Sequence, residues 1–520
     1  MQLFTLPDIV KNSAKLYPNR EAFKNSTNTV TFFQLDTKTS QLAKYLIDSG
    51  VKKGDRVGIY LNRCLETVIA IYGILKAGAV YVPLDFTAPH TRTKLVLENC
   101  EITFLISSPT LKSKVTKLLG HNLSLKCIIG LTHDVPVKTI SWEDIFKIDL
   151  TEYQPIKILE NDLAYIMFTS GSTGEPKGIM HTHKSGLSYA KLSSDLYGLN
   201  HEDRVGNHAP INFDISTFGY FSAPLVGAST VLVSDAHTKL PSSLAQLIGN
   251  ENITIWYSVP LALIQLLNSG MLDKLNMASL RWVLFGGEVF GLKYLKELMK
   301  KWPNAKFSNV YGPAEVNQCT YYNFQSLPPN IKSLPLGKVW RNTDFKILNT
   351  DDEEAKLGKK GELVIRSGTM MSGYWKNKEL TEKSLYRETL DTSIEYVYYR
   401  TGDIVYQDEN GVLFFVGRDD RQVKIRGYRI DLDEIESVLI NHPDVNEAAV
   451  MVLNVGNEKE IYAAILLFED RVITPKELKL FCKKHLAIYA IPDDFEILKD
   501  LPRTSSGKID KKRIIAIKKN

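Results

Sequence analysis

The sequence predicts an α/β fold with a smaller α+β unit at its C-terminal end, and three observations carry this prediction. Through about residue 300, short runs rich in Val and Ile, such as RVGIYL and STVLVS, alternate with segments of helical periodicity, which is typical of parallel strands covered by helices. From Gly361 the strands are joined by Asp, Asn and Gly turns, which indicates an antiparallel meander or a small barrel. After Arg418, about a hundred residues remain, enough for a separate domain.

The N-terminal segment has the spacing of a short helix, with Ile9 and Val10 on one face. Lys11 and Lys15 interrupt the apolar run, so the segment lacks the continuous hydrophobic region of a signal peptide. The most apolar stretch, residues 68–75, is far too short to span a membrane. We expect no membrane association.

Charge and cysteine content narrow the class further. The 64 basic and 59 acidic residues leave a net charge of +5, too small and dispersed to predict nucleic-acid binding. Only the tail beyond Lys499 clusters cations, in KKRIIAIKKN, and we expect it to be a solvated, frayed end. The five cysteines have neither zinc-site spacing nor the density of a disulfide framework, so a soluble cytoplasmic protein is expected.

Within the C-terminal unit, the stretch DDRQVKIRGYRIDLDEIESVLINHPDV predicts a hairpin followed by a helix. The helix carries Ile435 and Leu439 on one face and acidic residues between Asp431 and Glu434 at its start. A strand EIYAAILLFE, a helix from Pro475 and the loop LPRTSSGKID complete the unit.

The loop FTSGSTGEPKG at residues 168–178 follows an apolar strand and offers hydroxyls and backbone N–H groups to an anion. The loop of nucleotide hydrolases needs Gly-Lys followed by Ser or Thr, whereas Lys177 follows Pro176 and precedes Gly178. The protein-kinase pattern fails as well, because neither VAIK nor HRD follows. The loop predicts phosphate binding, with a Gly-Ser linker as the alternative.

Four further motifs follow this loop in order: NVYGPAE at 309–315, YRTGD at 399–403, GRDDRQVKIRGYRID at 417–431 and PRTSSGKID at 502–510. With these motifs, the sequence resembles the adenylate-forming superfamily, which includes acyl-CoA synthetases, luciferases and the adenylation domains of nonribosomal peptide synthetases. The resemblance covers essentially the whole chain. It implies an N-terminal domain over residues 1–418, with two stacked αβ subdomains and a β-barrel-like subdomain, and a small mobile α+β domain over residues 419–520.

Enzymes of this superfamily join a carboxylate to ATP, release pyrophosphate and pass the acyl group from the adenylate to a thiol. Because one anion attacks another, the site needs cations and a metal more than a protein nucleophile. The sequence offers no Gly-x-Ser-x-Gly elbow with triad partners. The resemblance therefore implies ATP as the nucleotide and Mg²⁺ as the metal.

The resemblance assigns the nucleotide site to residues from several motifs. Thr169 to Lys177 would hold the β and γ phosphates, and Glu315 would hold Mg²⁺ through oxygen. Asp403 would accept both ribose hydroxyls, and Arg418 would reach the ribose or a phosphate. The implied nucleotide-binding set is Thr169, Ser170, Gly171, Ser172, Thr173, Gly174, Lys177, Gly286, Gly287, Glu288, Asn309, Tyr311, Asp403 and Arg418.

At the adenine end, Tyr311 would stack on the base, Asn309 would bond its amino edge and the backbone of residues 286–288 would line the ring. One position departs from the family. Ala314 stands where the family usually has a Thr whose hydroxyl donates to the α-phosphate. The loss of a charge-assisted hydrogen bond costs about 1.5 to 3 kcal/mol, so slower adenylation is expected unless a water or a neighbouring hydroxyl substitutes.

Lys508 is the catalytic residue that the resemblance implies, bridging the attacking carboxylate and the phosphate from a loop of small residues. A hinge at Asp420 would rotate the C-terminal domain between the two half-reactions. The hairpin with Lys424 and Gly427 would then replace Lys508, and Gly427 would let the backbone approach a pantetheine arm. A purely structural turn is the alternative for this hairpin.

Asp214, in HAPINFDISTFGYF, bears on the substrate class. In amino-acid-activating members an Asp here pairs with the α-ammonium group, and aryl-acid and fatty-acid members lack it. A carboxylate beside an apolar pocket is costly unless a cation pairs with it, although an N-cap Asp is the structural alternative. The implied substrate pocket is Asp214, Ile215, Phe218, Tyr257, Leu284, Gly286, Val310, Gln318 and Cys319, closed by Lys508.

Beyond Asp214, only Gln318 and Tyr257 bring obvious polarity to this pocket, so a small or medium neutral amino acid is expected. The segments ITIWYSVP, VLFGGEVF and NQCTYY are similar to freestanding ligases that load L-proline onto a carrier protein, whereas Phe218 and Gln318 depart from the aliphatic residues usual there. L-proline is the leading candidate for the substrate, and D-alanine or another small amino acid is the alternative.

The acceptor is expected to be a separate carrier protein acting in trans, because no carrier or thioesterase segment follows the lysine motif; coenzyme A is the alternative. Two other functions remain open at this point. One is an acyl-CoA or fatty-acyl ligase on the same fold, which Asp214 disfavours. The other is a non-catalytic nucleotide-binding or scaffold protein, which Ala314 favours and which Lys508, Glu315 and Asp403 together disfavour.

Overall fold

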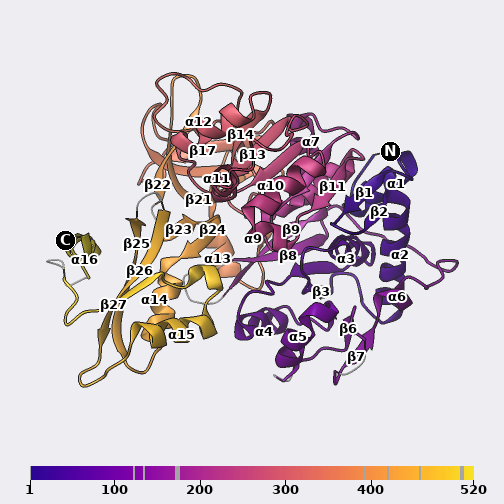
Figure 1. Ribbon diagram of the computed structural model, residues 1–520, viewed down its shortest axis with the longest axis horizontal. Helices are drawn as coiled ribbons and strands as arrows, with labels where there is room; N and C mark the ends of the chain where they lie inside the picture. Colours follow the sequence, from indigo (N-terminus) through magenta and orange to yellow (C-terminus); the bar gives the residue numbers. More distant parts are fainter. Residues whose placement is uncertain are drawn as a thin grey trace.

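The computed structural model describes residues 2–120, 123–132, 135–169, 176–391, 393–418, 421–455, 458–503 and 509–519. In these residues two large sheets lie in the N-terminal part and a smaller sheet follows them (Figure 1). The C-terminal unit, drawn in yellow, sits at one side of the molecule with the chain end at its outer edge.

The first large sheet has nine strands in the described residues, and its central strands run parallel. Their order is β16 (Lys338–Val339), β15 (Thr320–Phe324), β14 (Lys306–Tyr311), β13 (Trp282–Gly286), β12 (Ile255–Ser258), β10 (Arg204–Asn207), β11 (Ser229–Leu232), β1 (Glu21–Lys24) and β2 (Thr29–Thr31). The carboxyl ends of parallel strands meet at one edge. Gly286, the last residue of β13, therefore pairs with Val310, directly before Tyr311 at the end of β14.

The second large sheet has eight strands in the described residues. Their order is β19 (Gly373–Tyr374), β9 (Lys177–Thr182), β8 (Leu163–Thr169), β4 (Val80–Pro83), β3 (Arg56–Ile59), β5 (Phe104–Ile106), β6 (Cys127–Ile129) and β7 (Lys138–Ile140). Strands β8 and β9 are antiparallel, and Thr169 pairs with Lys177 at the end of their ladder. The two ends of the phosphate-loop motif are thus held side by side.

Helix α3 (Leu65–Lys76) lies between elements of the two sheets because it is apolar on nearly all sides. Its Tyr72 hydroxyl donates to the Tyr220 carbonyl oxygen at 2.7 Å, next to the nine-stranded sheet. The other helices of the N-terminal part are α1 (Pro7–Leu16), α2 (Phe32–Asp48), α4 (His90–Asn99), η1 (Pro109–Leu111), α5 (Lys112–Leu119), α6 (Trp142–Ile145), α7 (His183–Tyr197), η2 (Asp214–Ser216), η3 (Phe218–Ser222), α8 (Ala223–Leu225), α9 (Asp235–Lys239), α10 (Pro241–Asn250), α11 (Pro260–Asn268) and α12 (Leu292–Lys301).

The antiparallel meander predicted from Gly361 is a sheet of five strands in the described residues. It comprises β17 (Thr343–Leu348), β18 (Gly361–Ser367), β21 (Glu395–Gln407), β20 (Leu385–Thr389) and β22 (Leu413–Arg418), with α13 (Lys378–Lys383) beside it. Asp403 on β21 and Arg418 on β22 are directly opposite each other across the ladder. Opposite residues present their side chains on the same face, so this pairing brings two predicted site residues together.

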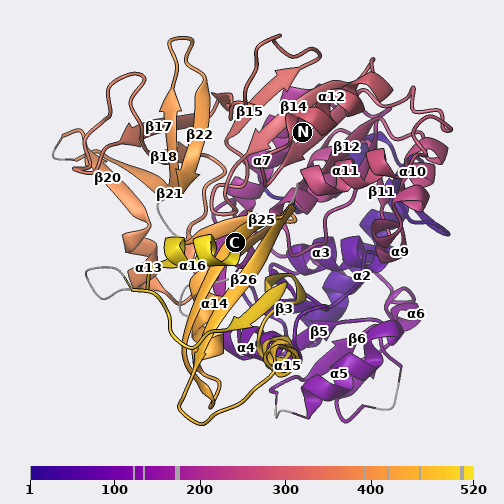
Figure 2. The same ribbon diagram turned by 60° about the vertical axis from the view of Figure 1, so that its left-hand side comes forward.

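The C-terminal unit contains the predicted hairpin, a three-stranded sheet and helices, and its apolar core consists of residues beyond 422. Figure 2 shows the sheet and helices of this unit in front of the N-terminal part. Its elements are β23 (Gln422–Ile425), β24 (Tyr428–Asp431), α14 (Leu432–Ile440), β25 (Val445–Val455), β26 (Glu458–Leu467), α15 (Pro475–His485), η4 (Ile488–Ala490), β27 (Asp494–Ile497) and α16 (Lys511–Lys519).

The basic tail is not the frayed end that the sequence predicted, because residues 511–519 form a helix that packs on its own unit. Ile514 of this helix is buried against the C-terminal core. Lys511 donates to Glu436 at 2.8 Å and Lys518 donates to Glu496 at 2.7 Å. These two cations are therefore engaged within the unit.

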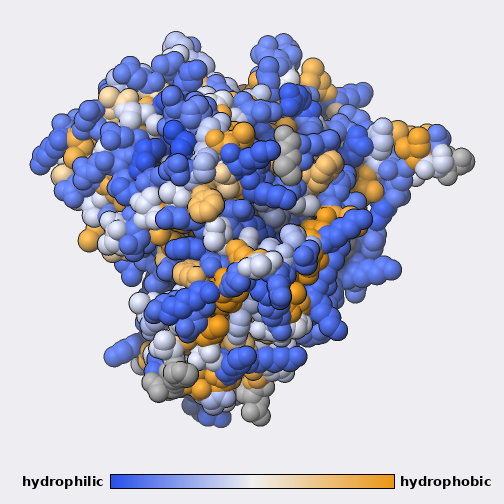
Figure 3. Space-filling model, turned by 90° about the vertical axis from the view of Figure 1, so that its right-hand side faces the viewer, coloured by the Kyte–Doolittle hydropathy of each residue, from blue (hydrophilic) through white to orange (hydrophobic). Residues whose placement is uncertain are grey.

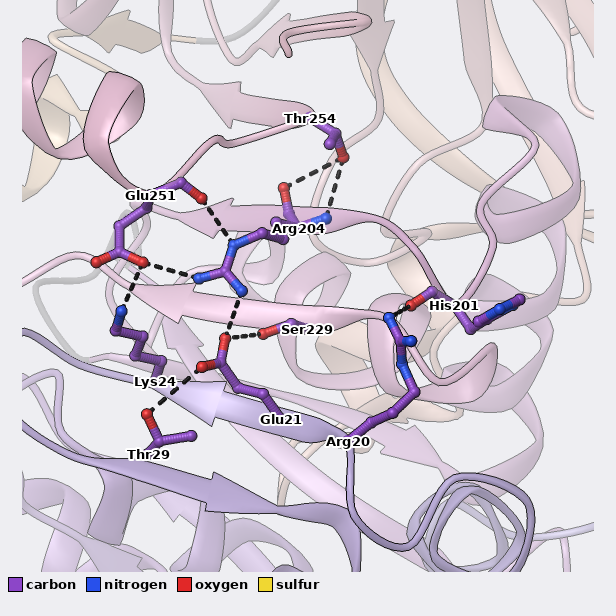
Figure 4. A network of polar contacts seen from close by, with 9 residues as sticks. All are labelled: Arg20, Glu21, Lys24, Thr29, His201, Arg204, Ser229, Glu251 and Thr254. Atoms are coloured by element: carbon purple, nitrogen blue, oxygen red, sulfur yellow. Dashed lines mark hydrogen bonds and ion pairs between the residues drawn. The ribbon is translucent and has the colours of Figure 1, made fainter.

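A polar network links β1 to β10 and α10 near one edge of the nine-stranded sheet. Figure 4 shows the Arg204 guanidinium between Glu21 and Glu251, with N–O distances of 2.7 and 2.8 Å. Lys24 reaches the same Glu251 carboxylate at 2.9 Å. The network joins β1, β10 and the end of α10, and it takes no part in the cavities described below.

The face drawn in Figure 3 is mostly hydrophilic, with apolar side chains in short patches between charged ones. Within the described residues, no helix combines the length and the apolar character needed to cross a membrane.

Candidate active site

Two neighbouring cavities lie where the hairpin β23–β24 meets the carboxyl edge of the nine-stranded sheet, and Lys424 lines both. The first, which we name the Asp214 cavity, has a volume of about 100 Å³. The second, which we name the Asp403 cavity, has a volume of about 340 Å³. Together they collect most of the described residues that the motifs implied.

In the Asp403 cavity, two neighbours fix the carboxylate of Asp403, which is 1% exposed. The Tyr311 hydroxyl donates to Oδ2 at 2.5 Å and Arg418 Nη1 donates to Oδ1 at 2.6 Å. Burial and the nearby carboxylate raise the pKa of Tyr311, so the phenol stays protonated as a donor. Each carboxylate oxygen keeps a further lone pair with which it could accept a ribose hydroxyl.

The other lining residues of the Asp403 cavity suit a purine ring. Asn309 donates from Nδ2 to the Pro335 carbonyl oxygen at 2.8 Å, which leaves its own carbonyl oxygen as the acceptor that an amino group needs. Gly287 and Glu288 also line this cavity. Gly287 has a φ of +93°, a conformation that favours glycine, and burial raises the pKa of the Glu288 carboxyl.

Glu315 lies at the junction of the two parts of the chain and is completely buried. The Tyr374 hydroxyl donates to Oε1 at 2.8 Å, and Arg429 Nη1 donates to Oε2 at 2.8 Å. Lys177 Nζ lies 3.6 Å from Oε1. Burial opposes ionisation, but Arg429 and Lys177 hold the pKa of Glu315 well below its usual range, so the buried carboxylate is charged.

The chemistry of this donor set fits Mg²⁺. A buried, ionised carboxylate is a suitable oxygen ligand for a hard cation that keeps several waters and bridges phosphates. No group of three or more His, Cys, Asp or Glu side chains in the described part of the chain is arranged to hold a metal. Glu315 would hold the cation through a carboxylate oxygen, and the cation would supply charge neutralisation for the phosphates.

Of the phosphate-loop motif, the structure describes the two ends. The Thr169 hydroxyl is buried and has no hydrogen-bond partner among the described residues, and it lines the Asp214 cavity together with Ala314. His181 donates from Nε2 to the Ala314 carbonyl oxygen at 2.9 Å, and burial lowers the pKa of His181 to about 4. Ser170, Gly171, Ser172, Thr173 and Gly174 lie outside the described residues.

Asp214 begins the helical turn η2 and lines the cavity that bears its name. Its Oδ1 accepts a hydrogen bond from the Ile215 N–H at 2.9 Å. Loss of hydration raises the pKa of Asp214 to about 6, while Lys424 acts in the opposite direction. A cationic group arriving beside this carboxylate would relieve the cost of its burial.

The remaining implied pocket residues fall into two layers. Ile215, Tyr257, Val310 and Gln318 line the Asp214 cavity, and Gln318 Nε2 donates to the Tyr257 hydroxyl. Phe218 lies behind Tyr257, edge to face at a ring distance of 5.8 Å. The residues that line neither this cavity nor its partner are Phe218, Leu284, Gly286 and Cys319.

The hairpin β23–β24 is packed into the site in this structure. Lys424 Nζ lies 5.4 Å from the ring centroid of Tyr311, and burial lowers the pKa of Lys424 while Asp403 raises it. Gly427, with a φ of +81°, packs so closely on Val259 that a Cβ would come within 2.4 Å of Val259 Cγ1. Asp420 and Lys508, the implied hinge and catalytic lysine, lie outside the described residues.

Sequence reasoning missed Arg429 and the two tyrosines beside it. Lys424 and Arg429 are directly opposite each other in the hairpin, so a Lys424 side chain in the site predicts an Arg429 side chain on the same face. Tyr428 and Tyr489 stack at 3.9 Å and line the Asp214 cavity. No local signal marks Tyr489, which reaches the site only through the packing of the C-terminal unit.

The chain is similar to known proteins over most of its length. The profile of the family described as AMP-binding enzyme matches residues 10–375, and that of the AMP-binding enzyme C-terminal domain matches residues 434–508. An L-proline--[L-prolyl-carrier protein] ligase of Pseudomonas fluorescens is 29% identical over 507 residues, covering 97% of this chain and 98% of the relative. The ligase of the same name from Streptomyces coelicolor is 32% identical over 521 residues, covering 97% and 95%.

A solved structure extends the likeness to three dimensions. An adenylation domain from Vibrio cholerae, in complex with glycyl-adenosine-5′-phosphate, superposes with a TM-score of 0.85 at 25% identity. The superposition covers 100% of this chain and 98% of that chain.

Proposed function

The chain belongs to the AMP-binding enzyme family, and from that premise we propose that it activates an α-amino acid with ATP and transfers it to the thiol of a carrier protein. The observation that carries the amino-acid part is Asp214, a carboxylate in a small cavity that adjoins the cavity of Asp403 and Tyr311. The raised pKa of Asp214 marks a carboxylate that gains from pairing with an α-ammonium group. The names of the two prolyl-carrier ligases support the same substrate and acceptor classes.

In the first step the nucleotide would lie in the Asp403 cavity. Asp403, fixed by Tyr311 and Arg418, would accept the ribose hydroxyls, and the Asn309 carbonyl oxygen would accept the adenine amino group. Thr169 and Lys177 would bind phosphate oxygens from the two ends of the loop. Thr169 also offers the neighbouring hydroxyl that Ala314 lacks. Bound Mg²⁺ would neutralise phosphate charge beside Glu315.

The substrate carboxylate would enter beside Asp214 and attack the α-phosphorus, with pyrophosphate leaving. Asp214 fixes the ammonium group and so sets the direction in which the carboxylate points. We keep Lys508 as the residue that bridges carboxylate and phosphate in this step and Asp420 as the hinge, on the strength of their motifs alone.

In the second step the thiol would attack the adenylate carbonyl, and AMP would leave. The packed hairpin supports a role for this orientation in transfer, since Lys424 then lies between the two cavities. Gly427 keeps the hairpin turn close to Val259, and Arg429 compensates the charge of Glu315. A carrier protein in trans is the acceptor that the prolyl-carrier ligases favour.

For the side chain of the substrate, we propose a small or medium neutral group, with L-proline as the leading candidate. The cavity volume of about 100 Å³ and the Gln318–Tyr257 hydrogen bond across its lining support a compact substrate. The relatives named for L-proline support the finer choice.

The deciding experiment is pyrophosphate exchange across the twenty L-amino acids and D-alanine, followed by thioester formation on a carrier protein and on coenzyme A. We expect exchange with few amino acids, L-proline foremost, and loading of the carrier but not of coenzyme A. Exchange that depends on a fatty or aryl acid and on no amino acid would refute the proposal. Complete absence of exchange would favour a non-catalytic nucleotide-binding protein.

A further inference from the structure

An ion pair joins the two parts of the chain outside both cavities. Arg92, in the first turn of α4, donates from Nη1 to Oε1 of Glu434, in the first turn of α14. The two residues are 342 positions apart in the sequence. The side chain of Glu434 is only 2% exposed and that of Arg92 is 13% exposed, so the pair is sealed between the two parts.

The contacts around this pair form a continuous seam that leads to the Asp214 cavity. Beside Arg92, the Thr91 hydroxyl donates to the Lys484 carbonyl oxygen at the end of α15, at 3.0 Å. Tyr428 packs edge to face on Phe213 at a ring distance of 5.1 Å, so it contacts the N-terminal part directly. Tyr489, stacked on Tyr428, is close enough to Arg92 for the two groups to influence each other's ionisation.

The pair belongs to this one orientation of the C-terminal unit. Because its two charges are carried by different parts of the chain, a rotation of the unit that moves α14 away from α4 separates them. Attraction between buried charges is largely offset by the hydration they lose, so such a pair directs the geometry without making the contact permanent. A reversible contact of this kind is what an alternating enzyme needs.

We propose that Arg92 and Glu434 are positioning residues for the transfer step, holding the C-terminal unit in the orientation that places the hairpin in the site. The inference rests on the proposed function, since the two orientations matter only for a reaction in two steps. Neither residue touches substrate in this scheme. They act through the Tyr428–Tyr489 wall and the hairpin, and they make no contribution to adenylate formation.

The first test measures the orientation without any reaction. Thr91→Cys and Lys484→Cys, in a Cys64→Ser background, place two thiols across the seam, and the other native cysteines are buried. A short bifunctional thiol reagent then reports contact as a shift on a denaturing gel. We expect Arg92→Met or Glu434→Gln to reduce the cross-linked fraction several-fold, and the charge-swapped pair Arg92→Glu with Glu434→Arg to restore it at least in part.

Lys94→Met is the matched control, because Lys94 lies on the same helix and pairs with Glu98 within that helix. It should cross-link like the parent protein. A parent-like cross-linked fraction in Arg92→Met would overturn the proposal. Circular dichroism and the melting temperature of each variant show that the fold is kept, and the charge swap keeps the test informative if one single variant fails to fold.

The second test separates the half-reactions, using free pantetheine as the thiol probe and the amino acid with the highest pyrophosphate exchange. Arg92→Met should keep exchange within about twofold of the parent and lower kcat for thioester formation about tenfold, with the KM for ATP unchanged. An equal fall of both half-reactions would overturn the positioning role. If the parent itself supports no exchange, the proposed function fails. The cross-linking result still shows whether Arg92 and Glu434 hold the C-terminal unit in this orientation.

Discussion

Arg429 and Glu315 form a buried ion pair, Nη1 to Oε2 at 2.8 Å, which ties the C-terminal hairpin to the carboxylate proposed as the Mg²⁺ ligand. The Arg429 guanidinium already compensates the charge of Glu315, so it opposes electrostatically the binding of a divalent cation at the same carboxylate. We therefore expect the docked hairpin to disfavour a cation at Glu315, and Arg429 is the first residue to test.

Arg429→Lys should impair transfer and spare adenylation. Lysine lacks the planar fork that holds both Glu315 and Gln422, so the hairpin would dock less firmly. Thioester formation should fall about tenfold, with pyrophosphate exchange near the parent level. Arg426→Lys is the matched control, because Arg426 lies in the same hairpin and pairs with Asp493 within the C-terminal unit. A parallel loss of both activities in Arg429→Lys would contradict the prediction.

Asp214→Asn should weaken amino-acid use. The amide keeps the shape of the carboxylate and loses its charge, which removes a charge-assisted bond worth about 1.5 to 3 kcal/mol, or roughly a 10- to 100-fold loss in kcat/KM for the amino acid. The KM for ATP should change little. Asp195→Asn, at an exposed position of the same domain, serves as the control. Parent-like kcat/KM for the amino acid would show that Asp214 does not hold the substrate.

The kcat/KM for the amino acid should depend on pH through the ionisation of Asp214. The pKa of Asp214 is about 6, so the carboxylate becomes protonated as the pH falls through 6 and loses its pairing with an ammonium group. The value of kcat/KM for the amino acid should fall through that range, and Asp214→Asn should lack this step. Because the folded pKa lies above the unfolded value, the carboxylate lowers stability above pH 6 and not below about pH 4. Asp214→Asn should therefore raise the melting temperature at pH 8 and leave it unchanged at pH 4.

Ala314→Thr should speed adenylation. The new hydroxyl would stand on the lining of the Asp214 cavity, where the Thr169 hydroxyl is the neighbouring donor. One added charge-assisted bond predicts about a tenfold rise in the exchange rate. Thr169→Val should slow the parent more than it slows the Ala314→Thr variant, because the two hydroxyls serve the same phosphate. Equal slowing of both backgrounds would show that Thr169 does not substitute.

Gly427→Ala should block the hairpin from docking. The added Cβ would lie 2.4 Å from Val259 Cγ1, at a φ of +81° that costs about 1 to 2 kcal/mol for an L side chain. Transfer should fall at least about tenfold with exchange retained, and adding Val259→Ala should recover part of it. Gly120→Ala is the control, since a Cβ there meets only the Lys117 carbonyl oxygen, at 3.5 Å. Full transfer activity in Gly427→Ala would contradict the close packing.

The layered architecture could be predicted from the sequence because each strand, helix and turn has a local pattern of residue types. Val- and Ile-rich runs predicted the parallel strands, and the turns after Gly361 predicted the antiparallel sheet that pairs Asp403 with Arg418. The prediction of a frayed tail was wrong. It was based on the density of charged residues and overlooked the apolar Ile514, which packs helix α16 on its unit. Composition reports solvation, but a single buried side chain can decide whether a short segment packs.

The residues of the candidate site could be predicted from the sequence only in part. The motifs implied Asp214 and Gln318, which the fold brings to one cavity, and also Leu284 and Cys319, which lie behind its wall. Burial depth depends on how neighbouring strands stack, which is not encoded in residue type. The roles of Asp420 as a hinge and of Lys508 as a catalytic residue remain sequence predictions.

By itself the sequence determined the order of the motifs, and hence the family, and it supplied the residue types from which nucleotide, metal and amino-acid binding were predicted. Only the tertiary structure decided which of them meet, because contacts such as Arg429 with Glu315 and Arg92 with Glu434 join residues far apart in the chain. Local periodicity fixes which face a side chain occupies. What that face meets is set by packing between distant elements, and in this protein by the orientation of one unit against the other.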